Sequence, residues 1–147
     1  MLESKRNQIG LTPRQIEICL QAWELLCEGK KNRKLVISKA TQHGSCTRFS
    51  ENDNVVYLGA NVYPNNGVDA NSRMSMIACL AHELAHADRF ELEFRRPIDL
   101  PDILIDEAET SLHASFMAKI TTKDREDLIE DARDRLIQWL AIIRDKE

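Results

Sequence analysis

The chain contains one short pattern of residue types suited to metal chemistry. His82 and His86 lie four positions apart, and Glu83 directly follows the first histidine. On a helix, positions i and i+4 lie on the same face one turn apart, so both imidazoles can reach one metal ion. Glu83 then lies about a quarter turn away, where it can hold a water on the metal without binding the metal itself. The pattern predicts a zinc hydrolase, and among zinc hydrolases it favours a peptidase.

A third metal ligand has to come from another part of the chain, because a catalytic zinc usually takes three protein ligands and leaves the fourth position to water. Glu107 lies twenty-one positions after His86, near the start of the next expected helix. A helix packed antiparallel to the first could bring this carboxylate to the same metal. Asp106 and Glu109 are alternatives. Ser111 follows Glu107 by one helical turn, so its hydroxyl could orient a ligand.

These residues resemble the motifs of the zincin metallopeptidases, and most closely the gluzincin arrangement, in which HExxH is followed by a glutamate on a later helix. Residues 107–114 are similar to the second motif of the ImmA/IrrE-type peptidases, where a glutamate stands four residues before an asparagine in a pattern like ExExNxFA. The resemblance covers residues 55–118 and implies Glu107 as the third ligand. The chain departs from the pattern at Ser111, in place of the asparagine, and at His113, in place of the aromatic residue. Members of that family are intracellular and often cleave one regulatory protein.

The mechanism implied is zinc-assisted hydrolysis of a peptide bond in a protein or peptide substrate. Zinc lowers the pKa of its bound water to around 7 and polarises the scissile carbonyl. Glu83 takes the water proton as general base and passes it to the leaving amine. A strand within residues 55–63 is expected to bind substrate by strand addition. The oxyanion needs a further donor, and five candidates remain open: His43, His113, Tyr57, Tyr63 and Arg73.

Composition limits the class of protein. A chain of 147 residues, 43% hydrophobic and 30% charged, suits a single globular domain over residues 1–147. No apolar run approaches the roughly 18–20 residues that span a bilayer, and residues 1–7 lead into no apolar stretch of a signal peptide. The net charge of −4 argues against broad attraction to nucleic acid. We expect a cytoplasmic protein with free cysteines and with no membrane or nucleic-acid partner.

The rest of the sequence predicts the fold that carries the histidines. A helix is expected over residues 13–28, and strands over residues 34–40 and 55–63, with a break near Gly59. The fold class is therefore α+β. We expect a minimal zincin-like domain in which a small, mostly antiparallel sheet of about three strands packs on the HExxH helix, with further helices on its N- and C-terminal sides.

Three more helices are expected, over residues 70–89 with the histidine pair, 102–120 with Glu107, and 123–145. The first is apolar around most of its circumference, which is typical of a buried helix. The last is amphipathic, and its charged face is expected to be solvated: Glu130, Asp131, Arg133, Asp134 and Arg135. The end of this helix carries an apolar group that could be core or a partner surface: Trp139, Leu140 and Ile143.

Two other functions remain open. In a catalytically silent or partner-activated zincin-fold binding module, protein groups could fill all four zinc positions, Cys79 or Cys46 included, although a small buried thiol is the expected state of Cys79. The same motif can also hydrolyse a non-peptide amide bond. Arg95 and Arg96 could bind a substrate carboxylate, although a solvated connection is the simpler expectation. The sequence does not indicate the substrate, an activating signal or the oligomeric state.

Overall fold

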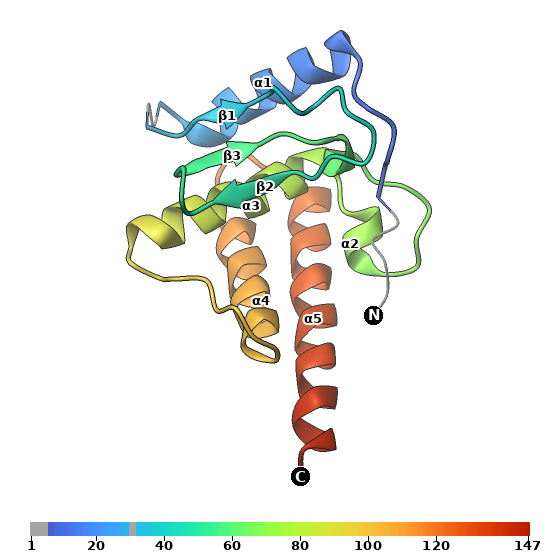
Figure 1. The fold of residues 1–147 in the computed structure, drawn as a ribbon, viewed down its shortest axis with the longest axis vertical. Helices are drawn as coiled ribbons and strands as arrows, with labels where there is room; N and C mark the ends of the chain where they lie inside the picture. The colour runs from blue at the N-terminus through green and yellow to red at the C-terminus, as the bar shows by residue number, and fades with distance from the viewer. Residues whose placement is uncertain (1–5, 30–31) are drawn as a thin grey trace.

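The computed structural model describes residues 6–29 and 32–147. Residues 1–5, which make up most of the stretch weighed above as a signal peptide, lie outside the described residues. The described chain forms five α-helices, three short strands and a 3-10 turn, which confirms the predicted α+β class (Figure 1). In order these are α1 (Pro13–Cys27), β1 (Leu35–Val36), β2 (Arg48–Ser50), β3 (Val55–Tyr57), η1 (Ala60–Val62), α2 (Ala70–Arg73), α3 (Met76–Glu91), α4 (Asp102–Ser115) and α5 (Thr122–Asp145).

The sheet is mixed and has the strand order β1-β3-β2. β2 pairs with β3 antiparallel, as expected for most of the sheet, whereas β1 pairs with β3 parallel. Both edges of β3 are therefore occupied, and this strand cannot add a substrate strand as we expected for residues 55–63. The two edge strands are β1 and β2, and the sequence did not indicate β2 because only Phe49 of its three residues is apolar.

The predicted helix over residues 70–89 is divided into α2 and α3 by two residues of extended backbone, Met74 and Ser75. Ser75 then caps α3, because its hydroxyl accepts a hydrogen bond from the Ala78 N–H. Two carboxylates of α5 hold this cap in place. Asp127 accepts from the Ser75 N–H, and Asp124 accepts from the Ser75 hydroxyl. The helix that carries the histidines thus begins at a point fixed by α5.

Helix α3 lies at the centre of the molecule. It contacts α1, β2 and β3 as well as α4 and α5. In Figure 1, α1 and the sheet lie at one end of the molecule, and α4 and α5 run side by side away from that end. The core contains side chains from all these layers, among them Leu58, Leu80, Leu84 and Leu128, each at most 1% exposed.

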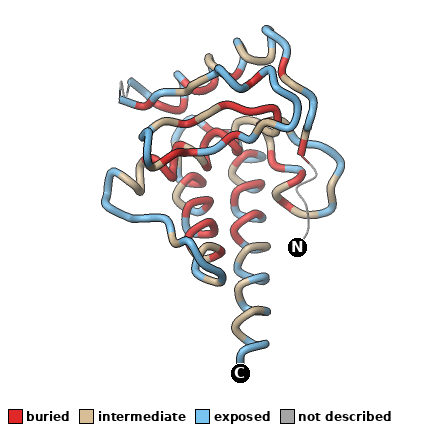
Figure 2. Tube along the Cα trace, in the orientation of Figure 1, coloured by how far each residue is buried: buried red, intermediate tan, exposed pale blue. Residues whose placement is uncertain are grey.

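Helix α5 has a buried half and an unburied half. Its buried residues all lie between Asp124 and Ala132, and none follows. Figures 1 and 2 show the second half extending beyond the end of α4, with its trace exposed or half-buried. Within the described part of the chain, no helix combines the length and apolarity needed to cross a membrane.

Replacing Leu84 with alanine tests whether α3 is held by the core. Leu84 is 1% exposed, so Leu84→Ala should lower the free energy of unfolding by about 2–5 kcal/mol, measured by urea denaturation. Leu25 of α1 is 64% exposed, so Leu25→Ala should change it by less than about 0.5 kcal/mol. Equal effects of the two substitutions would contradict this packing.

Candidate metal centre

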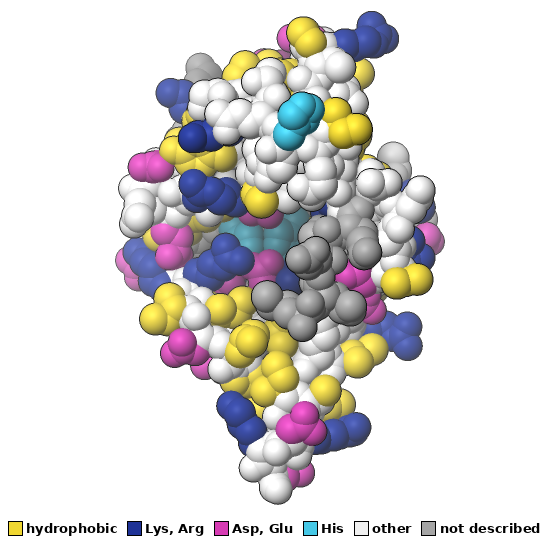
Figure 3. All heavy atoms as spheres, turned by 45° about the vertical axis from the view of Figure 1, so that its right-hand side comes forward, with side chains coloured by type: hydrophobic (Ala, Val, Ile, Leu, Met, Phe, Trp, Pro, Cys, Tyr) yellow, Lys and Arg dark blue, Asp and Glu magenta, His cyan; other side chains and the backbone are white. Residues whose placement is uncertain are grey.

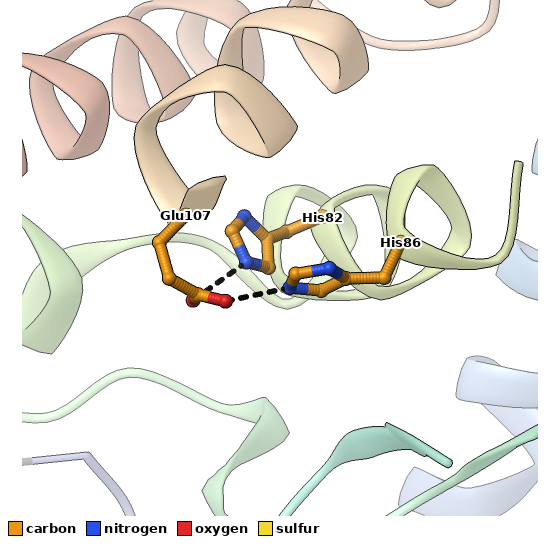
Figure 4. Close-up of side chains that lie close together, drawn as sticks. All are labelled: His82, His86 and Glu107. Atoms are coloured by element: carbon orange, nitrogen blue, oxygen red, sulfur yellow. Dashed lines mark hydrogen bonds and ion pairs between the residues drawn. The ribbon is translucent and has the colours of Figure 1, made fainter. Parts of the chain in front are cut away.

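Two imidazoles of α3 and one carboxylate of α4 converge in the interior. His82 Nε2 lies 3.2 Å from Glu107 Oε2, and His86 Nε2 lies 2.8 Å from Glu107 Oε1 (Figure 4). One ligand atom from each residue lies within 4.8 Å of the other two, and all three side chains are buried. The helical spacing places both histidines on one face of α3, and the packing of α4 on α3 supplies the carboxylate.

Only one of the three acidic candidates on α4 reaches the histidines. Asp106 and Glu109 both bind the guanidinium of Arg89, at 3.1 and 3.0 Å. Glu107 points to the other side of the helix, into the cluster. Of the residues that the structure describes, the cluster comprises His82, His86 and Glu107 and includes neither Cys79 nor Cys46.

Cys79 is instead the buried thiol that its position suggested. It is 6% exposed, and burial raises the pKa of its thiol to about 12.

A hydroxyl on α4 fixes the tautomer of His82. Ser111 Oγ lies 2.8 Å from His82 Nδ1, and it donates its only proton to Asp131 Oδ2 at 2.6 Å. The oxygen of Ser111 must therefore accept a hydrogen bond from Nδ1–H. The neutral ring then presents its Nε2 lone pair to the centre of the cluster. This is the orienting contact that we expected of Ser111, and it extends to α5 through Asp131.

His86 has a similar contact one turn further along. Thr110 Oγ1 lies 3.5 Å from His86 Nδ1 and donates its proton to the Asp106 carbonyl at 2.7 Å. Its oxygen can therefore only accept from Nδ1–H, which again directs Nε2 toward Glu107. Thr110 was not singled out in the sequence, because threonine on a helix has no motif of its own.

Three electron-pair donors facing one another need a positive charge between them. Burial raises the pKa of Glu107, but hydrogen bonds with His82 and His86 outweigh burial and hold that pKa well below its ordinary value. Burial lowers the pKa of His82, and Glu107 more than offsets this, so the pKa of His82 is raised. Protons on the rings can supply the charge, and so can a cation. Two imidazoles and a carboxylate form a donor set that can hold a divalent metal ion.

Two arginines also contact Glu107. Arg96 Nη2 lies 2.8 Å from Oε1, and Arg135 Nη2 lies 3.6 Å from Oε2. Arg96 belongs to the connection between α3 and α4, and its contacts hold this connection against the metal centre. Its backbone N–H donates to Glu51, in the turn between β2 and β3. Its guanidinium is therefore not simply solvated.

The expectation that the charged residues of α5 are solvated is wrong for Asp131 and Arg135. The side chain of Asp131 is 1% exposed and that of Arg135 is 21% exposed, and the two are bonded at 3.0 Å. Burial alone lowers the pKa of Arg135, whereas the charges of Asp131 and Glu107 raise it above its ordinary value. The sequence held a signal for this placement, since positions 131 and 135 follow the buried Leu128 by three and seven residues and share its side of the helix.

The Glu83 carboxylate lies between α3 and the edge strand. Glu83 Oε1 accepts a hydrogen bond of 2.9 Å from the Phe49 N–H of β2. Val56, which lies opposite Phe49 in the ladder, donates its N–H to Lys34 on the β1 side. The two residues therefore form a non-hydrogen-bonded pair, and the Phe49 N–H points to the other edge of β2. Glu83 is half-buried, and its charge also acts on His82 and Arg135. The HExxH glutamate thus lies beside the cluster without belonging to it.

The five oxyanion candidates from the sequence make their contacts elsewhere. His43 accepts from the Gly10 N–H, Tyr57 donates to Asp53, Tyr63 contacts Cys19, Arg73 pairs with Glu130, and His113 pairs with Asp88. The cations that do lie at the cluster are Arg96 and Arg135.

The cluster can be reached from outside. Figure 3 shows histidine side chains at the floor of a hollow in one face of the molecule, with acidic and basic side chains beside them. Comparison with known proteins adds no assignment, because no protein-family model, no curated protein and no solved structure matches the chain.

Removing the Ser111 hydroxyl should weaken metal binding. Ser111→Ala deprives His82 Nδ1–H of its acceptor, so the affinity for Zn²⁺ should fall about 10–100-fold, measured by competition with a chromophoric chelator. Ser115→Ala is a matched control, because that buried hydroxyl, one turn further along α4, donates only to the Leu112 carbonyl. The same loss of affinity in both variants would contradict the orienting role.

Removing the Arg135 guanidinium should destabilise the metal-free protein. Arg135→Gln leaves Asp131 and Glu107 buried without their nearest cation from α5, so the free energy of unfolding should fall by about 3 kcal/mol, measured by urea denaturation. Arg133, two positions away, is exposed, and Arg133→Gln should have an effect below about 0.5 kcal/mol. A small and equal effect of both would mean that the Arg135 side chain is solvated after all.

Proposed function

We propose that the protein is a zinc-dependent metallopeptidase, an intracellular endopeptidase of narrow specificity that acts on a protein partner. The observation that carries the proposal is the convergence of His82, His86 and Glu107 on one point, with the Glu83 carboxylate beside it. Two histidines and a glutamate are the ligand set of one group of catalytic zinc sites. The proposal also agrees with the resemblance of the sequence to the gluzincin motifs.

Each side chain has a role that follows from its contacts. His82, His86 and Glu107 would hold the ion, and Ser111 with Asp131 keeps His82 in the binding tautomer. A zinc ion bound here would supply Lewis acidity, which brings the pKa of a bound water near ~7 and polarises a carbonyl. Three protein ligands leave a position for that water, which favours catalysis over a purely structural site.

Glu83 is suited to the role of general base. It is the one carboxylate of α3 that lies next to the cluster and is not itself bound to a histidine, and the Phe49 N–H holds it at the edge of the sheet. From this position it can accept a proton at the cluster and return it to the leaving amine.

The edge of β2 is suited to binding an extended peptide. β2 pairs on one side only, and the Glu83 contact lies on its other side. A peptide that adds to this edge by main-chain hydrogen bonds would take the Phe49 N–H from Glu83, and it would lie along the histidine helix. Arg96 and Arg135 bring positive charge to the same place and are the candidates for stabilising an oxyanion.

The test compares wild type with Glu83→Gln. The variant should keep its metal, measured as zinc per chain. Its cleavage rate should fall at least about 10²-fold, since general base catalysis contributes about 10²–10⁴-fold. Activity is measured as new protein termini in a cell lysate by mass spectrometry. Glu91→Gln is the matched control, because this α3 carboxylate is exposed and pairs with Arg33.

Three outcomes would contradict the proposal in different ways. Failure of wild type to bind zinc would remove the metal centre. Zinc-loaded protein that generates no new termini would favour the catalytically silent binding module. Cleavage by Glu83→Gln at the rate of wild type would exclude Glu83 as the base.

A further inference from the structure

The outer face of α4 and α5 carries an apolar groove of about 330 Å³. Leu112 of α4 lines it together with Ile129, Leu136, Ile137 and Leu140 of α5, and each of these five side chains is between 39% and 54% exposed. Ala132 and the exposed Arg133 complete the lining. The groove lies on the side of α5 opposite Asp131 and Arg135, which face the metal centre. It is therefore a separate surface from the candidate site.

Single exposed apolar side chains are common and need no explanation. Here the apolar positions 129, 136, 137 and 140 follow one face of a helix and form a stripe, with the Arg133 side chain among them. Part of the stripe lies on the half of α5 that extends beyond α4 (Figure 1). A stripe of this length, on a helix that extends beyond its neighbour α4, is typical of a helix-packing surface.

The two ends of the stripe carry opposite charges. Glu126 and Arg144 are eighteen positions apart, which is about five turns at about 3.6 residues per turn, so both flank the stripe on the same side. Both are exposed, and neither has an ion-pair partner among residues 6–29 and 32–147. Between them, Ile129 and Leu140 lie at similar distances from position 135.

We propose that this stripe is the interface of a two-fold symmetric dimer, in which α5 packs antiparallel against α5 of a second copy. With the axis near position 135, Glu126 faces the partner's Arg144, and Ile129 faces the partner's Leu140. Because the same patch serves both copies, the contact is isologous and closes at two subunits. The contact runs along about 27 Å of helix at about 1.5 Å per residue.

A second copy fits this surface better than another occupant. An antiparallel helix pair needs opposite charges at equal distances from its centre, and Glu126 and Arg144 meet this need. An anionic lipid surface favours basic residues beside the stripe, whereas here the exposed Glu126 and Glu130 accompany Arg133 and Arg144. The dimer also leaves the hollow over the metal centre open, because that centre lies on the other side of α5.

Sedimentation velocity from micromolar to millimolar concentration tests the proposal. Wild type should form a dimer, and Leu140→Glu should raise the dissociation constant by about tenfold or more, because it places a charge in the apolar contact. Leu25→Glu is the matched control, since Leu25 of α1 is exposed and lies off the stripe. Circular dichroism and zinc content show that each variant is folded.

A charge exchange gives a second test that does not depend on the apolar residues. Glu126→Arg and Arg144→Glu should each weaken the dimer, and the double variant should recover most of the loss because the two pairs are restored with reversed sign. Three results would overturn the proposal: a wild type that stays monomeric at millimolar concentration, a dimer that Leu140→Glu does not affect, or a double variant no tighter than the single ones. A wild type that stays monomeric and binds a different protein through the groove would also overturn the proposal.

Discussion

The organisation of this molecule depends on one hydrogen-bonded chain, from Asp131 through Ser111 to His82. A serine hydroxyl has a single proton, and Asp131 takes it. Ser111 must then accept from His82 Nδ1–H, and the other ring nitrogen is left to face Glu107. These hydrogen bonds link α5, α4 and α3, so the geometry of the cluster is set by the packing of three helices and not by the histidine helix alone.

Charge balance is the second constraint on the interior. Glu107 and Asp131 are buried carboxylates, and isolated buried charges are costly. Arg135 and Arg96 offset them, together with the two imidazoles. A metal ion at the same point would contribute further positive charge, and it would share Glu107 with the arginines. Metal binding at this point would therefore be coupled to the stability of the interior through one carboxylate.

Helix α5 has two faces that the composition of its sequence does not distinguish. One face supplies Asp131 and Arg135 to the interior, and Asp127 to the cap of α3. The opposite face carries the apolar stripe between Ile129 and Leu140. A helical period places buried charges on one side and exposed apolar side chains on the other, which reverses the usual pattern of a surface helix. Both departures from the pattern lie where we infer function.

The sequence by itself determined the features that depend on local spacing. The α+β class and the placement of His82 and His86 on one helical face follow from a period of 3.6 residues, which needs no knowledge of neighbours. The tertiary structure decided which carboxylate of α4 meets the histidines, because Asp106 and Glu109 are turned toward Arg89. It also decided that β2 is an edge strand beside the histidine helix and that α5 contributes to the site. These contacts join segments far apart in the chain, and a local pattern carries no information on which of several similar side chains the packing will select.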